Sequence, residues 1–198
     1  MDGSMFRRIN RLADRTGWAH GFFSSYARYG IVLFGVLLVA AYLEARGHGD
    51  LRGVAGSVWA ALAAPLALLV AQLVGGAIDR ARPYETMTGV HLLIDRTTDF
   101  SFPSDHATAV GAVAVGLLFT SRRWGIVAAV LALLMALARV YVGAHYPGDV
   151  LAGLALGAAV ATAGRFVVVP LLTRAAVWMS RTAARPLVTS APAATTAA

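Results

Sequence analysis

Long runs of apolar residues constrain the fold of this chain more than any other feature. Five are long enough to be considered as membrane helices: residues 29–45, 53–78, 106–120, 124–142 and 149–172. The hydrocarbon core of a bilayer is about 30 Å thick and needs roughly 20 apolar residues of helix, and backbone polar groups must be paired within it. The chain is also 58% hydrophobic, above the roughly 45–50% of soluble domains. We therefore predict an all-α integral membrane protein, a multi-pass helical bundle of five to six transmembrane helices.

The two ends of the chain differ from this apolar centre. Residues 1–28 carry arginines among aromatic and aliphatic residues at helical spacing, which predicts an N-terminal interfacial amphipathic helix. A sixth span could be hidden in this segment, although it would place His20 and Arg28 in lipid at a cost. Residues 176–198 are rich in Ala, Thr and Pro, which predicts a disordered tail. The transmembrane domain is then expected to cover residues 29–175.

The basic charge of the chain comes entirely from arginine. The formal net charge is +7 and no lysine occurs. The arginines are spread over the termini and short loops rather than gathered on one aromatic-rich face, so we expect no nucleic acid as a partner. Membrane lipids with anionic headgroups are the expected partners of this charge. Because there is no cysteine, disulfides and thiolate metal sites are excluded.

Three polar clusters interrupt the apolar pattern at the ends of the predicted spans. They are residues 79–85 after the second span, 103–106 before the third, and 138–149 between the fourth and the fifth. Alternate spans run antiparallel, so all three clusters are expected on the same face of the membrane. The arginine-bearing loops 46–52 and 121–125 fall on the opposite face, which favours a cytoplasmic position for those loops and an outward-facing polar site. With five spans, however, the basic residues 1–28 fall on the side of the site, which weakens this rule.

Arginine and serine side chains in these clusters suit an anion. Arg80, Arg82 and Arg139 carry guanidinium forks that match phosphate oxygens. Arg139 lies near the membrane end of a span, where an ionisable group is costly unless it is used. Ser104 precedes a helical run and is predicted to be its N-cap. Helix N-termini attract anions, although capping alone would also explain this serine.

Two histidines and an aspartate could supply the chemistry. His106 and His145 share the face of the arginines, and an imidazole can attack phosphorus or protonate a leaving oxygen. Asp149 follows His145 by four residues and could fix its tautomer, or could only complement the dipole of the fifth helix. We expect no metal and no cofactor, because the neighbouring arginines would repel a cation and no known metal-ligand spacing occurs.

Together, the clusters resemble the signature of the type 2 phosphatidic acid phosphatase superfamily of integral membrane lipid phosphatases, with its vanadium haloperoxidase relatives. That signature is a Lys followed by Arg-Pro, then Pro-Ser-Gly-His, then Ser-Arg with a His and an Asp downstream. The matching residues are Arg82-Pro83, Pro103-Ser104-Asp105-His106, and Ala138-Arg139 with His145 and Asp149. The departures from the signature are Gly75 in place of the Lys, Asp105 in place of the Gly and Ala138 in place of the Ser.

The resemblance implies a mechanism and the residues that perform it. His145 would attack the terminal phosphorus to form a phosphohistidine, Asp149 would orient His145, and His106 would protonate the leaving oxygen. The phosphate would be bound by Arg82, Arg139 and the backbone at Ser104, with Arg80 as a candidate replacement for the missing Lys.

The stretch SFPSDHAT and the residues before it resemble the bacterial branch that dephosphorylates undecaprenyl pyrophosphate and is associated with bacitracin resistance. This implies a polyprenyl pyrophosphate substrate at the plasma membrane and a role in recycling carrier lipid for cell-wall synthesis. Two alternatives stay open. One is the same chemistry on phosphatidic acid, phosphatidylglycerol phosphate or another lipid phosphate. The other is a weakly catalytic lipid-phosphate binder or transporter, which the glycine at position 75 motivates.

Overall fold

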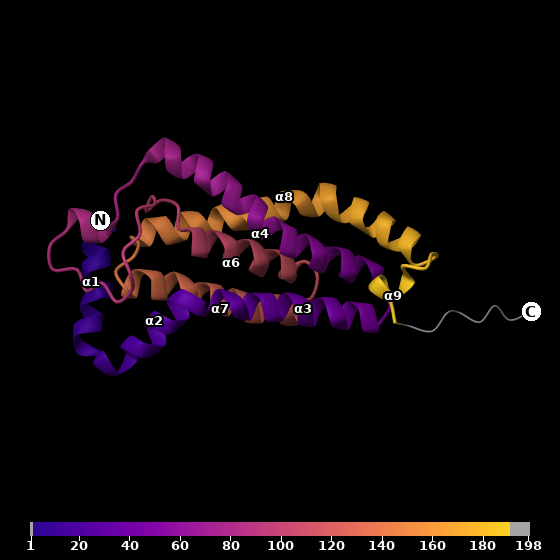
Figure 1. Ribbon diagram of the computed structural model, residues 1–198, viewed down its shortest axis with the longest axis horizontal. Helices are drawn as coiled ribbons and strands as arrows, with labels where there is room; N and C mark the ends of the chain where they lie inside the picture. The colour runs from indigo at the N-terminus through magenta and orange to yellow at the C-terminus, as the bar shows by residue number, and fades with distance from the viewer. Residues whose placement is uncertain (1, 191–198) are drawn as a thin grey trace, which may run out of the picture.

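The helices of the protein follow the apolar runs closely in a computed structural model that describes residues 2–190 (Figure 1). The five runs correspond to α3 (Ile31–Gly47), α4 (Leu51–Ile78), α6 (Asp105–Leu118), α7 (Arg122–Tyr141) and α8 (Pro147–Met179). Helices α4, α7 and α8 are each long and apolar enough to cross a membrane, and α3 forms a fourth candidate span with the preceding α2 (His20–Tyr29), bent by 57°. Large apolar side chains remain exposed along α3, α4 and α8, as contact with lipid requires. The predicted all-α membrane bundle is confirmed, whereas three or four spans, rather than the predicted five to six, meet the requirement of length and composition among the described residues.

The shortest of these five helices, α6, lies at the centre of the bundle. It has 14 residues and is therefore about 21 Å long, less than the thickness of the hydrocarbon core. Nearly all its side chains from Ala107 to Leu117 are buried, and it contacts α4, α7 and α8. Protein rather than lipid therefore surrounds it. Small residues allow this close contact, since a Cβ on Gly157 of α8 would lie 2.1 Å from the carbonyl oxygen of Thr108.

The N-terminal segment differs from the single interfacial helix that was predicted. It forms α1 (Asp2–Arg15) and α2, separated by a 3-10 turn at Gly17–Ala19. The apolar face of α1 contacts α7 and α8, and Phe6 and Asn10 are buried there. The helical spacing correctly indicated an amphipathic helix, but spacing does not say whether protein or lipid covers its apolar face.

The C-terminal segment is folded further than expected. Helix α8 continues to Met179, and α9 (Arg185–Val188) turns back so that Val188 packs against Val54 near the start of α4. The backbone N–H of Ser190 donates to the carbonyl of Arg46 at 3.1 Å. The prediction of a disordered tail is therefore wrong for residues 176–190, because one apolar turn within the low-complexity sequence finds a partner in the bundle. The rest of that prediction, residues 191–198, lies outside the described residues.

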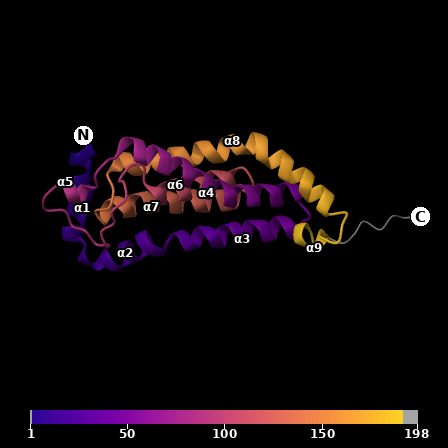
Figure 2. The same cartoon turned by 45° about the horizontal axis from the view of Figure 1, so that its top comes forward.

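The three polar clusters meet at one end of the bundle. Helices α4 and α7 end there, α6 and α8 begin there, and residues 79–104, with the short α5 (Pro83–Thr86), connect α4 to α6. Figures 1 and 2 show α1 lying across this same end, whereas α9 lies at the other. The antiparallel order of the helices thus gathers the predicted site residues on one side, as expected.

Candidate active site

A pocket of about 270 Å³ opens at this end of the bundle. Four of the predicted residues line it: Arg82, Arg139, His106 and His145. The rest of its wall is formed by Arg28, Ile94, Asp95, Thr97, Asp99 and Asp105. Two imidazoles and two guanidinium groups predicted from separate motifs therefore share one space, which suits a phosphate group.

His145 lies in the turn between α7 and α8 and is 1% exposed. Its Nδ1 is 2.8 Å from the carbonyl oxygen of Ser101. Because a carbonyl can only accept, we assign the proton to Nδ1 and the lone pair to Nε2. Burial and the charges of Arg139 and Arg82 lower the pKa of His145 well below its ordinary value, so the ring is neutral at neutral pH. Nε2 is therefore chemically suited to act as a nucleophile.

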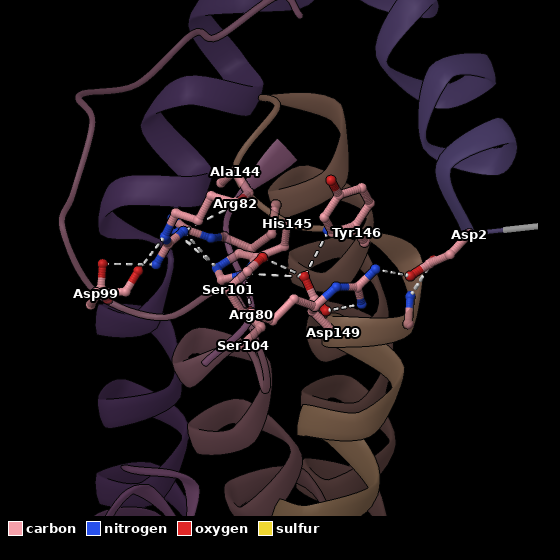
Figure 3. A network of polar contacts seen from close by, with 12 residues as sticks. Asp2, Arg80, Arg82, Asp99, Ser101, Ser104, Ala144, His145, Tyr146 and Asp149 are labelled. Carbon is pink, nitrogen blue, oxygen red and sulfur yellow. Dashed lines mark hydrogen bonds and ion pairs between the residues drawn. The ribbon is translucent and has the colours of Figure 1, made fainter. Parts of the chain in front are cut away.

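Two buried arginines hold Nε2 of His145 between them. Nη1 of Arg82 lies 3.2 Å from this nitrogen, and Nη2 of Arg139 lies 3.3 Å from it. Arg82 is itself fixed by the carbonyl of Ala144 at 3.1 Å and the carboxylate of Asp99 at 3.0 Å (Figure 3). Nε of Arg139 is buried and has no hydrogen-bond partner among the described residues. Leaving such a donor unpaired is costly, and an anion in the pocket is one group that could accept from it.

Asp149 contacts His145 less directly than predicted. Oδ2 of Asp149 is 3.9 Å from Nδ1 of His145, beyond hydrogen-bond distance. It accepts instead from the Ser101 hydroxyl at 2.6 Å and from the backbone N–H of Tyr146 at 2.9 Å. Because Pro147 begins α8, Asp149 falls in the first turn and bonds back to the residue that caps its own helix. Asp149 therefore caps its own helix directly and reaches His145 only through Ser101.

Ser101 is a site residue that the sequence analysis missed. Its hydroxyl donates to Asp149 and its backbone carbonyl accepts from His145, so it connects the two groups (Figure 3). Ser101 is fully buried. The one available signal was its position two residues before Pro103, inside the motif stretch that also holds Ser104 and His106.

Arg80 lies outside the pocket, in a different position from the one predicted. Its Nη1 is 2.6 Å from Oδ1 of Asp149, and its Nη2 is 2.7 Å from Oδ2 of Asp2 (Figure 3). It therefore binds carboxylates behind the site rather than replacing the family's lysine. The lysine position is occupied by Gly75, where a Cβ would lie 3.1 Å from the carbonyl oxygen of Phe102. The glycine lets the loop that carries Ser101 lie close against α4.

The residues that open α6 differ in their relation to the pocket. Ser104 is the N-cap as predicted, but its side chain makes no capping hydrogen bond, and its buried Oγ has no partner among the described residues. It is not part of the pocket wall, whereas His106 and Asp105 are. Asp105, which departs from the family glycine, accepts from the side-chain amide of Gln72 of α4 at 2.9 Å.

The most buried charges of the pocket are arginines, and the carboxylates of Asp95 and Asp99 are more exposed. The side chain of Arg82 is 4% exposed, and that of its partner Asp99 is 50% exposed. Asp95, paired with Arg28 at 2.7 Å, is 89% exposed. Burial alone would raise the pKa of Asp99, but hydrogen bonds from Thr97 and Arg82 and the charge of Arg82 lower it overall. The buried end of the pocket therefore carries positive charge, whereas its exposed part carries both signs, with Arg28 beside Asp95 and Asp99. Solvent screens the exposed charges more than the buried ones, which suits an anion at the buried end.

This arrangement defines a class of protein. The site combines a buried neutral imidazole with two fixed guanidinium groups inside a helical membrane bundle. These are groups that an enzyme needs to transfer a phosphoryl group. The chain belongs to the PAP2 superfamily, whose family model matches residues 55–171.

Individual relatives agree with this assignment. Undecaprenyl-diphosphatase BcrC of Bacillus subtilis is 30% identical over 154 residues, which cover 78% of this chain and 77% of that protein. Bacitracin transport permease protein BcrC of Bacillus licheniformis is 28% identical over 77% of this chain and 73% of that protein. The crystal structure of Aquifex aeolicus LpxE has the same fold, with a TM-score of 0.62, 22% identity, and coverage of 81% of this chain and 92% of that chain. The family resemblance predicted from the motifs is confirmed.

Proposed function

We propose that this protein is a membrane phosphatase that removes the terminal phosphate of a polyprenyl diphosphate such as undecaprenyl diphosphate, and so recycles carrier lipid for cell-wall synthesis. The observation that carries the proposal is the position of Nε2 of His145 between the guanidinium groups of Arg82 and Arg139. Similarity over most of the chain to the undecaprenyl-diphosphatase of Bacillus subtilis supports the choice of substrate.

His145 is the nucleophile of the proposed reaction. Its Nε2 attacks the terminal phosphorus, so that an N–P bond forms while the bridging P–O bond breaks and polyprenyl phosphate leaves with a proton from His106. His106 then takes a proton from water, and the resulting hydroxide attacks the phosphohistidine. The N–P bond breaks and inorganic phosphate is released, which restores both histidines for the next cycle.

The two arginines stabilise the charge that moves during this transfer. The same N–H groups that reach Nε2 of His145 can reach the equatorial oxygens of a phosphoryl group held against it. Fixed donors of this kind stabilise the transition state because they need no reorganisation during the reaction. Asp149 supports the imidazole through its negative charge and through Ser101, whose carbonyl accepts a hydrogen bond from Nδ1–H of His145.

Detergent-purified protein is expected to hydrolyse undecaprenyl diphosphate with a kcat/KM at least about tenfold above that for phosphatidate or phosphatidylglycerol phosphate. The physical reason is that a phosphate monoester is a better leaving group than a lipid alkoxide, and a tenfold ratio needs only about 1.4 kcal/mol of transition-state energy. Released phosphate is measured with each lipid in mixed micelles, with and without a chelator.

The alternatives make different predictions in the same assay. If kcat/KM were higher for phosphatidate or phosphatidylglycerol phosphate, the proposed diphosphate substrate would be wrong and that lipid would be the better assignment. Release from no lipid phosphate would contradict the enzymatic proposal and support a binder or transporter. Loss of activity with the chelator would contradict a reaction carried by the side chains alone.

We also propose that the site faces away from the cytoplasm of a plasma membrane. Arg46, Arg52 and the two arginines that begin α7 lie at the opposite end of the bundle, and short basic loops favour the cytoplasmic side. Because the chain has no cysteine, single cysteines at Thr98 near the site and at His48 at the opposite end can report the orientation. A membrane-impermeant maleimide added to intact cells is expected to label Thr98→Cys and not His48→Cys. The reverse pattern would place the site in the cytoplasm.

A further inference from the structure

The first residue of α1 reaches the back of the active site. Oδ2 of Asp2 accepts from Nη2 of Arg80 at 2.7 Å, and its Oδ1 accepts from the backbone N–H of Gly148 at 2.9 Å (Figure 3). A Cβ on Gly148 would lie 2.9 Å from the Asp2 carboxylate, so the two residues are in close contact. Asp2 therefore binds both the start of α8 and the arginine that faces Asp149.

Arg80 connects this aspartate to the buried carboxylate of the site. Asp149 is 0% exposed, and its Oδ1 accepts from Nη1 of Arg80 at 2.6 Å. A buried carboxylate needs a close opposite charge, and losing that partner is strongly destabilising for the buried group. The guanidinium of Arg80 also lies over the ring of Tyr146, 4.1 Å from its centroid. Arg80 is thus held on one side by the ring and at its two ends by Asp2 and Asp149.

Helix α1 is docked firmly enough to deliver Asp2 to this position. Phe6 is 1% exposed, and its ring centroid lies 5.6 Å from that of Tyr146. One turn further along, the side-chain amide of Asn10 donates to the carbonyls of His91 and Tyr141, each at 2.9 Å, and accepts from the backbone N–H of His91. These contacts fix the register of α1 against the bundle, so the carboxylate of Asp2 is not at a freely moving end.

We propose that Asp2 and Arg80 are positioning residues for the reaction, and that α1 is thereby part of the catalytic site. Asp2 orients Arg80, Arg80 orients Asp149, and Asp149 with Ser101 orients His145. Neither Asp2 nor Arg80 lines the pocket, so the pair acts on the rate of the chemical step rather than on the binding of phosphate. The effect on rate rests on the proposed phosphatase function, whereas the effect on the His145 ring does not.

The chain of contacts is tested by a double-mutant cycle on the full-length protein, tagged at the C-terminus so that the residues around Asp2 are unchanged. Asp2→Asn is expected to lower kcat for undecaprenyl diphosphate roughly tenfold with little change in KM, because small misplacements of a catalytic group cost that much or more. Asp2→Glu should restore most of the rate. In the Arg80→Gln background, Asp2→Asn should have almost no further effect, because its target is already removed.

Asp14→Asn is the matched control. It makes the same chemical change on the same helix, but its carboxylate faces the half-exposed imidazole of His91, away from the site. Its kcat is expected to stay at the wild-type value. An equal loss in Asp14→Asn and Asp2→Asn would mean that α1 docking in general, and not the link to Arg80, sets the rate. That result would overturn the proposal, and so would effects of Asp2→Asn and Arg80→Gln that simply add.

A second measurement separates this inference from the proposed function. The ring nitrogens of His145, labelled with 15N and assigned with His145→Gln, should shift in Asp2→Asn and stay unchanged in Asp14→Asn. If wild-type protein released phosphate from no lipid while these signals shifted as stated, the proposed function would be wrong and the positioning role would stand. Unchanged His145 signals in Asp2→Asn would overturn the positioning role whatever the activity.

Discussion

Replacing His145 with glutamine is expected to reduce phosphate release from undecaprenyl diphosphate by at least about a thousandfold, because removing a nucleophile removes the covalent pathway itself. Glutamine is neutral and of similar length, and it can still donate to the Ser101 carbonyl that now accepts from Nδ1. The loss should therefore appear in kcat, with the protein still folded. Initial rates and thermal stability in the same detergent measure both.

Chemical trapping gives the same prediction a second readout. Protein incubated with substrate labelled with 32P in its terminal phosphate and quenched in alkali should retain label, because phosphohistidine survives base and is lost in acid. His145→Gln should retain none. His48→Gln is the matched control, since His48 caps the far end of α3 and is exposed. Full activity in His145→Gln, or alkali-stable label on it, would contradict His145 as the nucleophile.

Replacing Arg139 with lysine is expected to lower kcat by about 100-fold to 1,000-fold, even though the charge is kept. Arg139 spans two contacts, with Nη1 donating to the carbonyl of Ala27 at 3.2 Å and Nη2 lying 3.3 Å from Nε2 of His145. A lysine ammonium is a point charge without the planar fork, so it cannot make the contacts to Ala27 and to His145 at the same time. Removing one preformed donor from a site for developing negative charge typically costs this much.

The control for this prediction changes an arginine at the opposite end of the bundle. Arg123→Lys alters an exposed side chain that pairs with Glu44 at 2.7 Å, and its activity should match that of the wild type. The kinetics are measured together with thermal stability, because Arg139 is buried and its replacement also affects packing. If Arg139→Lys kept a rate within threefold of wild type, the guanidinium fork would not be needed and the proposed role of Arg139 would be wrong.

Most of the helices could be predicted from the sequence because a bilayer imposes a simple rule on length and polarity. The run at residues 53–78 became α4 from Leu51 to Ile78, and the run at 124–142 became α7 from Arg122 to Tyr141. The predictions were incomplete at the N-terminal end of the chain and wrong for residues 176–190 at the other. At both ends a short apolar face is covered by the rest of the bundle, as the burial of Phe6 and Val188 shows. Local spacing identifies such a face but does not predict what covers it.

The site shows the same division. His106, His145, Arg82 and Arg139 could be predicted because the order of antiparallel helices alone brings their motifs to one face, and all four line the pocket. Their partners could not be predicted in the same way. Ser101 binds both Asp149 and His145 across more than forty positions of sequence, and its place beside the Pro-Ser motif does not by itself indicate these partners.

The sequence by itself determined that this chain is a helical membrane bundle whose separated polar motifs meet at one end, since hydrophobic length and motif order are properties of the linear chain. Only the tertiary structure decided how the site is supported. It placed Arg80 on Asp149 instead of in the pocket, and it brought Asp2 to Arg80 from 78 positions away. Hydrogen bonds depend on atomic positions within a few tenths of an ångström, and those positions arise only when distant segments pack against one another.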